Sequence, residues 1–441
     1  MFPVHLTSNK NILNTLLKSL FLECNSYDCY FQTNMKSPIG KYWKYVENIV
    51  FILVAATILY GLVEGFSTSM WKSLTGKGFV DDLVTPITTK EYYKSVLALL
   101  SIATTFFILV ELVRLIIGEY RKLNRESKSS NGTTSYTGKY KFTYVWKQVM
   151  HRYKSNFLSR IFNEYLSKAI VIFVYALWMP YFEKLSFFKI GNQWYWWIYA
   201  YFIWELSYWV WHYTAHRIRI LWCLHSPHHA PSEMNLTVAW VHFFAEGYYT
   251  AIIQVPILMM LGVKPAMVLI ILVIDGTWGT FIRTGERSFK NGRFGILQHL
   301  VITPSHHRVH HAKNPLYIDT NFCVLIPFWD WLFGTLQPEK KEVKIEYGIT
   351  REMDVTSFID FYFGECILLV KDVKNATGLK NKILYLFMPP GWTPESRQKT
   401  AAVVRSEFLR EHQELGLTSR RFLSFGNPVK FISARLFTKY P

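Results

Sequence analysis

Charged residues are scarce in this 441-residue sequence, where Lys, Arg, Asp and Glu together make up 18%. Typical soluble domains carry about 25%. Half of the residues are instead apolar, and 17% are aromatic. Trp, Tyr and Phe are abundant near the ends of the apolar runs, as in the aromatic belts of membrane proteins. The composition therefore argues against two or three soluble domains and predicts a polytopic membrane protein.

Cysteine and acidic residues are also few. The five cysteines are scattered, and their spacing excludes a disulfide framework or a zinc–thiolate site. The excess of Lys and Arg gives a net charge of +18, but these residues lie between apolar runs and form no nucleic-acid-binding module. We therefore expect a basic surface that faces anionic lipid, with a membrane as partner and no nucleic acid. We expect no secretory signal in residues 1–40, where the apolar patch is short and interrupted by Lys18.

Apolar runs predict the membrane topology. Four of them are long enough to cross a bilayer, at about residues 45–66, 95–118, 162–182 and 194–211. Two further runs, at 243–261 and 266–282, predict a helical hairpin that enters the bilayer and returns. The polar segment 119–154 is expected to be a loop, and its nine Lys and Arg against two Glu place it in the cytosol. Counted from this loop, the chain after residue 211 is cytosolic as well.

Histidine is concentrated in one part of the chain, since eleven of the fourteen lie between His212 and His311. They form three motifs: His212-x-x-x-His216, His225-x-x-His228-His229, and, directly after His306, His307-x-x-His310-His311. Spacings of three and four residues place side chains on one face of a helix, so each motif can aim several imidazoles at one point. Neutral imidazole is the commonest metal ligand. Scattered interfacial histidines would not be expected to repeat H-x-x-H-H twice, so the pattern predicts a metal site.

The number and kind of ligands favour two iron ions. A structural zinc site takes four ligands, often thiolates, whereas the eight motif histidines can serve two metals. Imidazole also suits iron, and the carboxylates of soluble di-iron bundles are absent. We expect His5, His151 and His412 to be structural, while His242 and His299 are either structural or neighbours of ligands.

These inferences together give an all-α polytopic membrane protein, a transmembrane helix bundle that carries a cytosolic, histidine-rich di-metal cap. We divide the chain into an N-terminal cytosolic or interfacial segment, transmembrane helices with the basic loop, a histidine-box domain, and a cytosolic C-terminal tail with short helices. Their bounds are residues 1–44, 45–193, 194–337 and 338–441. The sequence makes no prediction of the oligomeric state.

The order and gaps of the three motifs resemble the histidine boxes of the fatty acid hydroxylase/sterol desaturase superfamily. Within it, the stretches WHYTAHRIRILWCLHSPHHAPSEMNLTVA, TPSHHRVHHAKNPLYIDTNF and WDWLFGTL are similar to the alkylglycerol monooxygenase branch. The resemblance covers about residues 194–337. It implies a di-iron, multi-pass enzyme of the endoplasmic reticulum membrane whose histidine boxes face the cytosol. Such an enzyme uses O2 and tetrahydrobiopterin to hydroxylate the ether-linked carbon of an alkylglycerol, which then splits into a fatty aldehyde and a glycerol derivative.

The resemblance also assigns roles to individual residues. It implies catalytic or ligand-orienting roles for Glu205 and Asn235, and Asp319 lies in a matching stretch. The implied metal ligands are His212, His216, His225, His228, His229, His307, His310 and His311, with His306 as a ligand or a donor behind the ligands.

Two positions depart from the family pattern, and the milder departure is Arg217, where relatives tend to have an acidic residue. Arg283 stands where the family usually carries a histidine before its third box, and an arginine stays protonated and cannot ligate iron. Either that histidine is not essential, or His299 or His306 replaces it, or the activity differs.

Two other functions remain open at this point. One is a hydroxylase or desaturase of the same superfamily that acts on a sterol, a sphingolipid or a fatty acyl chain. The other, of a different class, is a metal-binding membrane transporter. Against the transporter, the histidines are predicted on one side of the membrane and do not line a path across it.

Overall fold

The computed structural model describes residues 109–110, 112–123, 138–163, 168–191, 193–286, 289–396 and 399–412. Within these ranges the chain is helical, with no strand and a single isolated bridge between Ala312 and Tyr347. The prediction of an all-α protein is confirmed for this part. Segment 1–44, the span at 45–66 and most of the span at 95–118 lie outside it.

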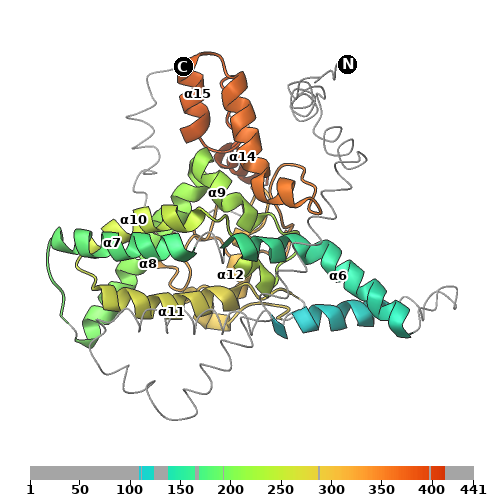
Figure 1. The fold of residues 1–441 in the computed structure, drawn as a ribbon, viewed down its shortest axis with the longest axis horizontal. Coiled ribbons are helices and arrows are strands. Elements are labelled where there is room, and N and C mark those ends of the chain that lie inside the picture. Colours follow the sequence, from blue (N-terminus) through green and yellow to red (C-terminus); the bar gives the residue numbers. More distant parts are fainter. Residues whose placement is uncertain are drawn as a thin grey trace, which may run out of the picture. The chain divides into compact units, whose positions relative to one another are not determined.

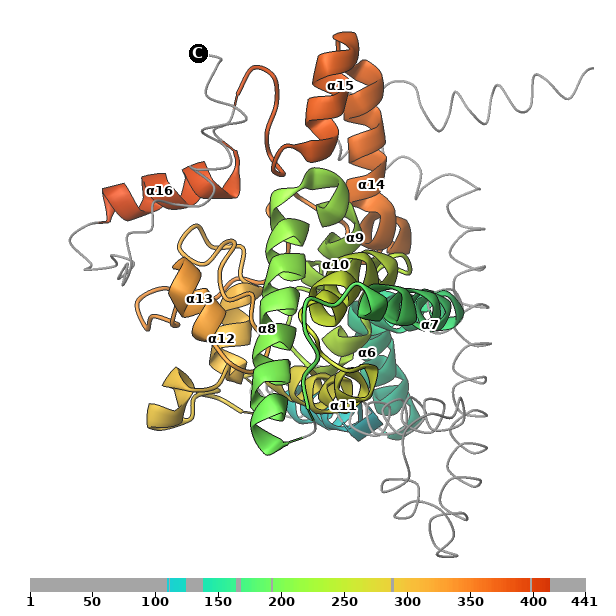
Figure 2. The same ribbon diagram turned by 90° about the vertical axis from the view of Figure 1, so that its left-hand side faces the viewer.

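Helices α7 (Lys168–Lys184), α8 (Trp194–Arg217), α10 (Glu246–Met260) and α11 (Pro265–Ile282) surround the main apolar core. Helix α7 packs against α10, and α8 runs across α10 and α11 (Figures 1 and 2). Trp204, Val255, Leu258, Met267 and Ile271 are almost completely buried where these helices meet. This core fixes the direction of α8, whose far end carries the first histidine motif.

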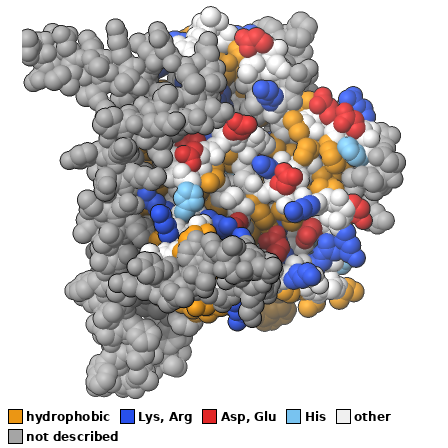
Figure 3. All heavy atoms as spheres, turned by 90° about the vertical axis from the view of Figure 1, so that its right-hand side faces the viewer, with side chains coloured by type: hydrophobic (Ala, Val, Ile, Leu, Met, Phe, Trp, Pro, Cys, Tyr) orange, Lys and Arg blue, Asp and Glu red, His pale blue; other side chains and the backbone are white. Residues whose placement is uncertain are grey.

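One helix in the described ranges, α11, is long and apolar enough to cross a membrane. Large apolar side chains are nevertheless exposed on its neighbours, with Leu177 of α7 54% exposed and Trp194 and Ile198 of α8 74% and 60% exposed. The face drawn in Figure 3 mixes apolar side chains with acidic and basic ones. The polytopic topology therefore stays a prediction.

The expectation of a loop at 119–154 is wrong at both ends, because residues 119–123 are helical and helix α6 spans Gly138–Ile161. Val145, Val149, Tyr153 and Phe157 recur every four residues and are buried, so they form one apolar face. This face packs on the short helix η2 (Leu236–Trp240) and on α14 (Phe358–Asn375). Five of the nine Lys and Arg that suggested a loop lie on α6, at positions other than those of its apolar face.

The remaining helices complete the site and the C-terminal region. Those nearer the histidines are α9 (Arg219–His229), η3 (Gly295–His299), α12 (Pro304–His310) and α13 (Phe328–Phe333). In the C-terminal region, α14 is followed by α15 (Gly378–Phe387) and α16 (Ala401–Glu411), in keeping with the short helices expected there. Helix α14 packs against both α9 and α15, so this region supports the helix that carries the second histidine motif.

Candidate metal centre

The three histidine motifs lie on three different helices. His212 and His216 occupy the last turns of α8, the second motif ends α9, and the third lies on α12 and its C-cap. Ile218 breaks the path between α8 and α9 with extended backbone, φ −119° and ψ 119°. Because the chain turns there, the second motif folds back toward the first.

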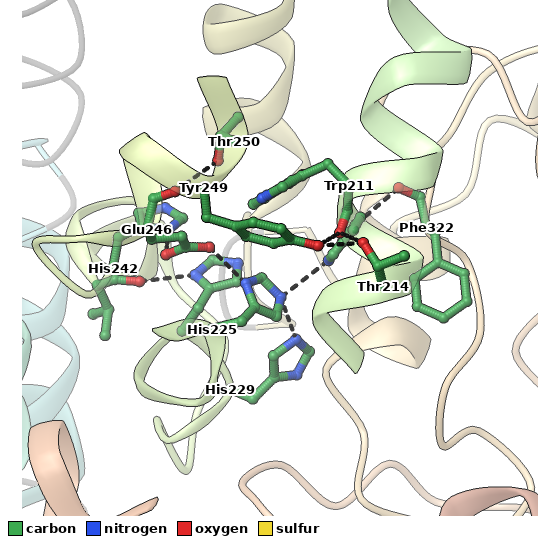
Figure 4. Close-up of polar contacts among 12 residues, drawn as sticks. Trp211, Thr214, His225, His229, His242, Glu246, Tyr249, Thr250 and Phe322 are labelled. Atoms are coloured by element: carbon green, nitrogen blue, oxygen red, sulfur yellow. Dashed lines mark hydrogen bonds and ion pairs between the residues drawn. The ribbon is translucent and has the colours of Figure 1, made fainter. Parts of the chain in front are cut away.

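Five histidines form one buried group: His212, His216, His225, His229 and His310. One nitrogen from each lies within 4.8 Å of the others. The Nε2 atom of His225 is 3.1 Å from the Nε2 atoms of both His212 and His229. We call this set the five-histidine group; Figure 4 shows His225 between His229 and Glu246.

A second buried set consists of His228, His307 and His311, which we call the three-histidine group. The Nε2 atoms of His307 and His311 lie 3.1 Å apart. The Arg283 guanidinium reaches the same place, with Nη2 3.2 Å from Nε2 of His228. The structure therefore puts this arginine directly against the second group.

Hydrogen bonds fix the tautomers in the five-histidine group. Nδ1 of His212 donates to the Phe322 carbonyl and Nδ1 of His310 to the Thr320 carbonyl, each over 2.8 Å. Since a carbonyl oxygen only accepts, the proton sits on Nδ1 and the lone pair is on Nε2. Nδ1 of His216 similarly faces Oδ1 of Asp319 at 3.1 Å. This is the usual way in which proteins orient metal-bound imidazoles.

Glu246 holds two histidines at once. Its Oε1 accepts from Nδ1 of His225 over 2.6 Å, and its Oε2 from Nδ1 of His242 over 2.9 Å. Figure 4 shows this carboxylate on α10, facing both rings. His242 was expected to be either structural or a neighbour of ligands, and these contacts place both His242 and Glu246 behind the ligand candidates.

The donor set fits a metal ion in the five-histidine group. Nε2 of His216 and Nε2 of His310 are buried and have no hydrogen-bond partner, although buried polar atoms normally have one. Burial lowers the pKa of the His310 imidazole to about 3 and that of His216 well below its ordinary value. The rings are therefore neutral at pH 7, and their inward lone pairs are free to bind a cation.

The structure brings eight of the nine predicted metal residues together. The exception is His306, whose Nδ1 accepts from the backbone N–H of Thr303 in a capping box at the start of α12. His299 also lies outside both groups, on η3. Neither histidine stands in for the one that Arg283 replaces.

Glu205 and Asn235 have structural contacts. The Glu205 carboxylate is fully buried and accepts the backbone N–H groups of Val324, Leu325 and Ile326 at 2.7–3.2 Å. Asn235 caps η2, where its Oδ1 accepts from the Thr237 N–H. Both side chains hold backbone segments in place. The contacts described for them join neither side chain to a histidine of the two groups, so their predicted catalytic roles stay predictions.

Backbone carbonyls were the part of the site that sequence reasoning missed. Thr320 and Phe322 take part through their main chain, so their side-chain identity gives no signal. The one clue is local: Asp319 and Asn321 have positive φ, 56° and 58°, a conformation that Asp and Asn tolerate better than most residues. Each of these two residues directly precedes a residue whose carbonyl accepts from a ring: Thr320 from His310 and Phe322 from His212.

Replacing Asp319 by asparagine should weaken metal binding at the five-histidine group about tenfold, as is typical when a partner of a ligating histidine is altered. The variant keeps the left-handed backbone but removes the charge that faces His216 and Arg217. Competition with a chelator of known affinity would measure the change. Unaltered affinity would show that Asp319 only shapes the turn.

Histidine motifs at helix ends, converging in two buried groups, define a helical metal-binding protein. Comparisons with known proteins narrow this class. Residues 197–335 match the model of the fatty acid hydroxylase family, so this region of the chain is similar to that family. No solved structure matches the chain.

Similar proteins with assigned activities include alkylglycerol monooxygenases. The one from Xenopus tropicalis is 30% identical over 203 residues, 46% of this chain and 44% of the relative. The human one is 29% identical over 190 residues, 43% of this chain and 41% of the relative. An ornithine lipid hydroxylase of Rhizobium tropici is 27% identical over 140 residues, 32% of this chain and 41% of the relative. The match thus spans less than half the length of these curated relatives.

Proposed function

We propose that this chain is a membrane-bound di-iron oxygenase that cleaves the ether bond of alkylglycerols, forming a fatty aldehyde and a glycerol derivative with O2 and tetrahydrobiopterin. The observation that carries the proposal is the convergence of five buried imidazoles, two of which, His216 and His310, have an Nε2 atom without a hydrogen-bond partner. The family match supports lipid hydroxylation, and the names of the similar proteins support an alkylglycerol as substrate.

The residues around the histidines suit this chemistry. Bound iron would supply the oxidising power that no side chain has for breaking a C–H bond. Trp211 stacks on His212 with ring centroids 5.2 Å apart, and Trp222 lies 5.2 Å from His216. Phe322 packs edge-on against both of these imidazoles. These rings exclude water and hold the ligand candidates in a rigid apolar shell.

A membrane location agrees with the proposed substrate. We place the chain in the endoplasmic reticulum membrane as a multi-pass protein, with the histidine groups on the cytosolic side. The apolar helix α11 and the exposed Leu177, Trp194 and Ile198 support contact with lipid. An alkyl chain would then enter sideways from the bilayer, with its polar headgroup near water.

Membranes from cells that express the chain should convert labelled alkylglycerol to fatty aldehyde only when O2 and tetrahydrobiopterin are both supplied. Membranes from cells without the chain are the control, and aldehyde is measured after trapping as a hydrazone. Oxidation of a sterol or a ceramide with alkylglycerol left intact would move the proposal to another substrate of the superfamily. Purified protein that holds zinc alone would contradict an iron oxygenase.

A further inference from the structure

Arg283 contacts an atom that a metal ion would need. The residue follows α11 and is 8% exposed, and its Nη2 lies 3.2 Å from Nε2 of His228. Its Nη1 donates to the Gly279 carbonyl one turn earlier. A Cβ added at Gly279 would stand 3.2 Å from Nη1, so the glycine leaves room for the guanidinium. The guanidinium of Arg283 is therefore held in a defined position by contacts on both of its Nη atoms.

The His228 lone pair can have only one partner at a time. Its Nδ1 donates to the Val241 carbonyl over 3.0 Å, which places the ring proton on Nδ1 and the lone pair on Nε2. Arginine has only donors, so Nε2 of His228 accepts from Arg283. The same Nε2 would have to point at a cation bound with His307 and His311. A metal ion and the guanidinium thus compete for one lone pair.

Charge adds to this competition. The guanidinium remains positive at neutral pH, and a positive group beside a cation site repels the cation. The five-histidine group has two carboxylates in direct contact, Glu246 with His225 and Asp319 with His216, and the Arg217 guanidinium near it is paired with Asp319. Such carboxylates favour a bound cation. The two groups therefore differ in both the number of free lone pairs and the sign of the neighbouring charge.

We propose that Arg283 makes the two metal positions unequal: the five-histidine group binds first and tightly, and the three-histidine group binds a second ion only when the guanidinium releases His228. This inference rests on the proposed two-metal function and assigns Arg283 the role of a competitor within that site. It predicts that the chain passes through a state with one bound metal before it holds two.

Cobalt(II) titration of the full-length, metal-free protein in detergent tests the inference, with bound metal measured by equilibrium dialysis and mass spectrometry. The unmodified chain should bind one equivalent tightly and a second about tenfold more weakly or worse, as expected from the loss of one charge-assisted hydrogen bond. Arg283→Gln and Arg283→Met should strengthen the second step about tenfold and leave the first unchanged. Arg293→Gln, which removes an arginine outside both groups, should change neither step.

The possible outcomes distinguish a failure of the role proposed for Arg283 from a failure of the proposed function. Two equal steps in the unmodified chain, or a second step that neither Arg283 variant strengthens, would overturn this inference alone. Loss of the first step in both variants would also overturn it, because the five-histidine group should not depend on Arg283. Absence of any tight equivalent in the unmodified chain would overturn the proposed function together with the inference.

Discussion

Replacing His310 by alanine is expected to abolish turnover, with activity falling more than about 100-fold, beyond the loss typical for residues that only support a ligand. Its Nε2 is buried without a partner inside the five-histidine group, and its Nδ1 is already held by the Thr320 carbonyl. Removal of the ring deletes one of five converging nitrogens. Product formation from labelled alkylglycerol and the iron content of the purified variant measure the effect.

His306 supplies the matched control, because it is a histidine of the same helix in a different role. Glutamine at this position can still accept from the Thr303 N–H, as in an ordinary capping box. His306→Gln should therefore keep the iron content and the activity within about twofold of the unmodified chain, because the variant preserves the acceptor of the capping box. If this variant lost iron as His310→Ala does, His306 would be a ligand after all.

Glu205→Ala should destabilise the fold by about 3 kcal/mol, because three backbone N–H groups, one of them fully buried, would lose their acceptor. The affected residues, 324–326, follow Phe322, whose carbonyl orients His212. Thermal unfolding of the detergent-solubilised protein should show a lower apparent melting temperature. The variant should also bind iron less tightly, as an indirect result of the displaced segment.

Glu205→Gln distinguishes a structural role from a catalytic one. The amide oxygen can still accept from Leu325 and Ile326, which both bond to Oε1, and only the contact with Val324 is lost. We expect the glutamine variant to be more stable than Glu205→Ala, though less stable than the unmodified chain, and to retain substantial activity. A glutamine variant that is stable, loaded with iron and inactive would instead show that the Glu205 carboxyl takes part in proton transfer.

The spacing of the histidines predicted eight residues of the site, and it also determines which of the two groups each histidine joins. In each H-x-x-H-H motif, the two residues four apart stay together, while the remaining histidine turns to the other group. His225 and His229 thus join the five-histidine group and His228 joins the other, whereas His307 and His311 pair and His310 crosses over. Neighbours in sequence point about 100° apart on a helix, which explains this division.

Two other features, the main-chain acceptors of the site and helix α6, were not predicted from the sequence. Main-chain acceptors such as the Phe322 carbonyl depend on the path of a segment that lies 110 positions away from His212 in the sequence. Helix α6 was hidden because its charges were counted without regard to the four-residue recurrence of Val145, Val149 and Tyr153. Tertiary contacts therefore decide the first feature, whereas helix α6 follows from a local periodicity of the sequence.

The crossed contributions of α9 and α12 have a mechanical consequence. Since each of these helices supplies both histidine groups, the two helices cannot separate without opening both sites at once. Ions bound there would cross-link α8, α9 and α12, joining segments as far apart as His212 and His311. Metal binding of this kind becomes part of the folding free energy. The metal centre would therefore also stabilise the packing of α8, α9 and α12 against one another.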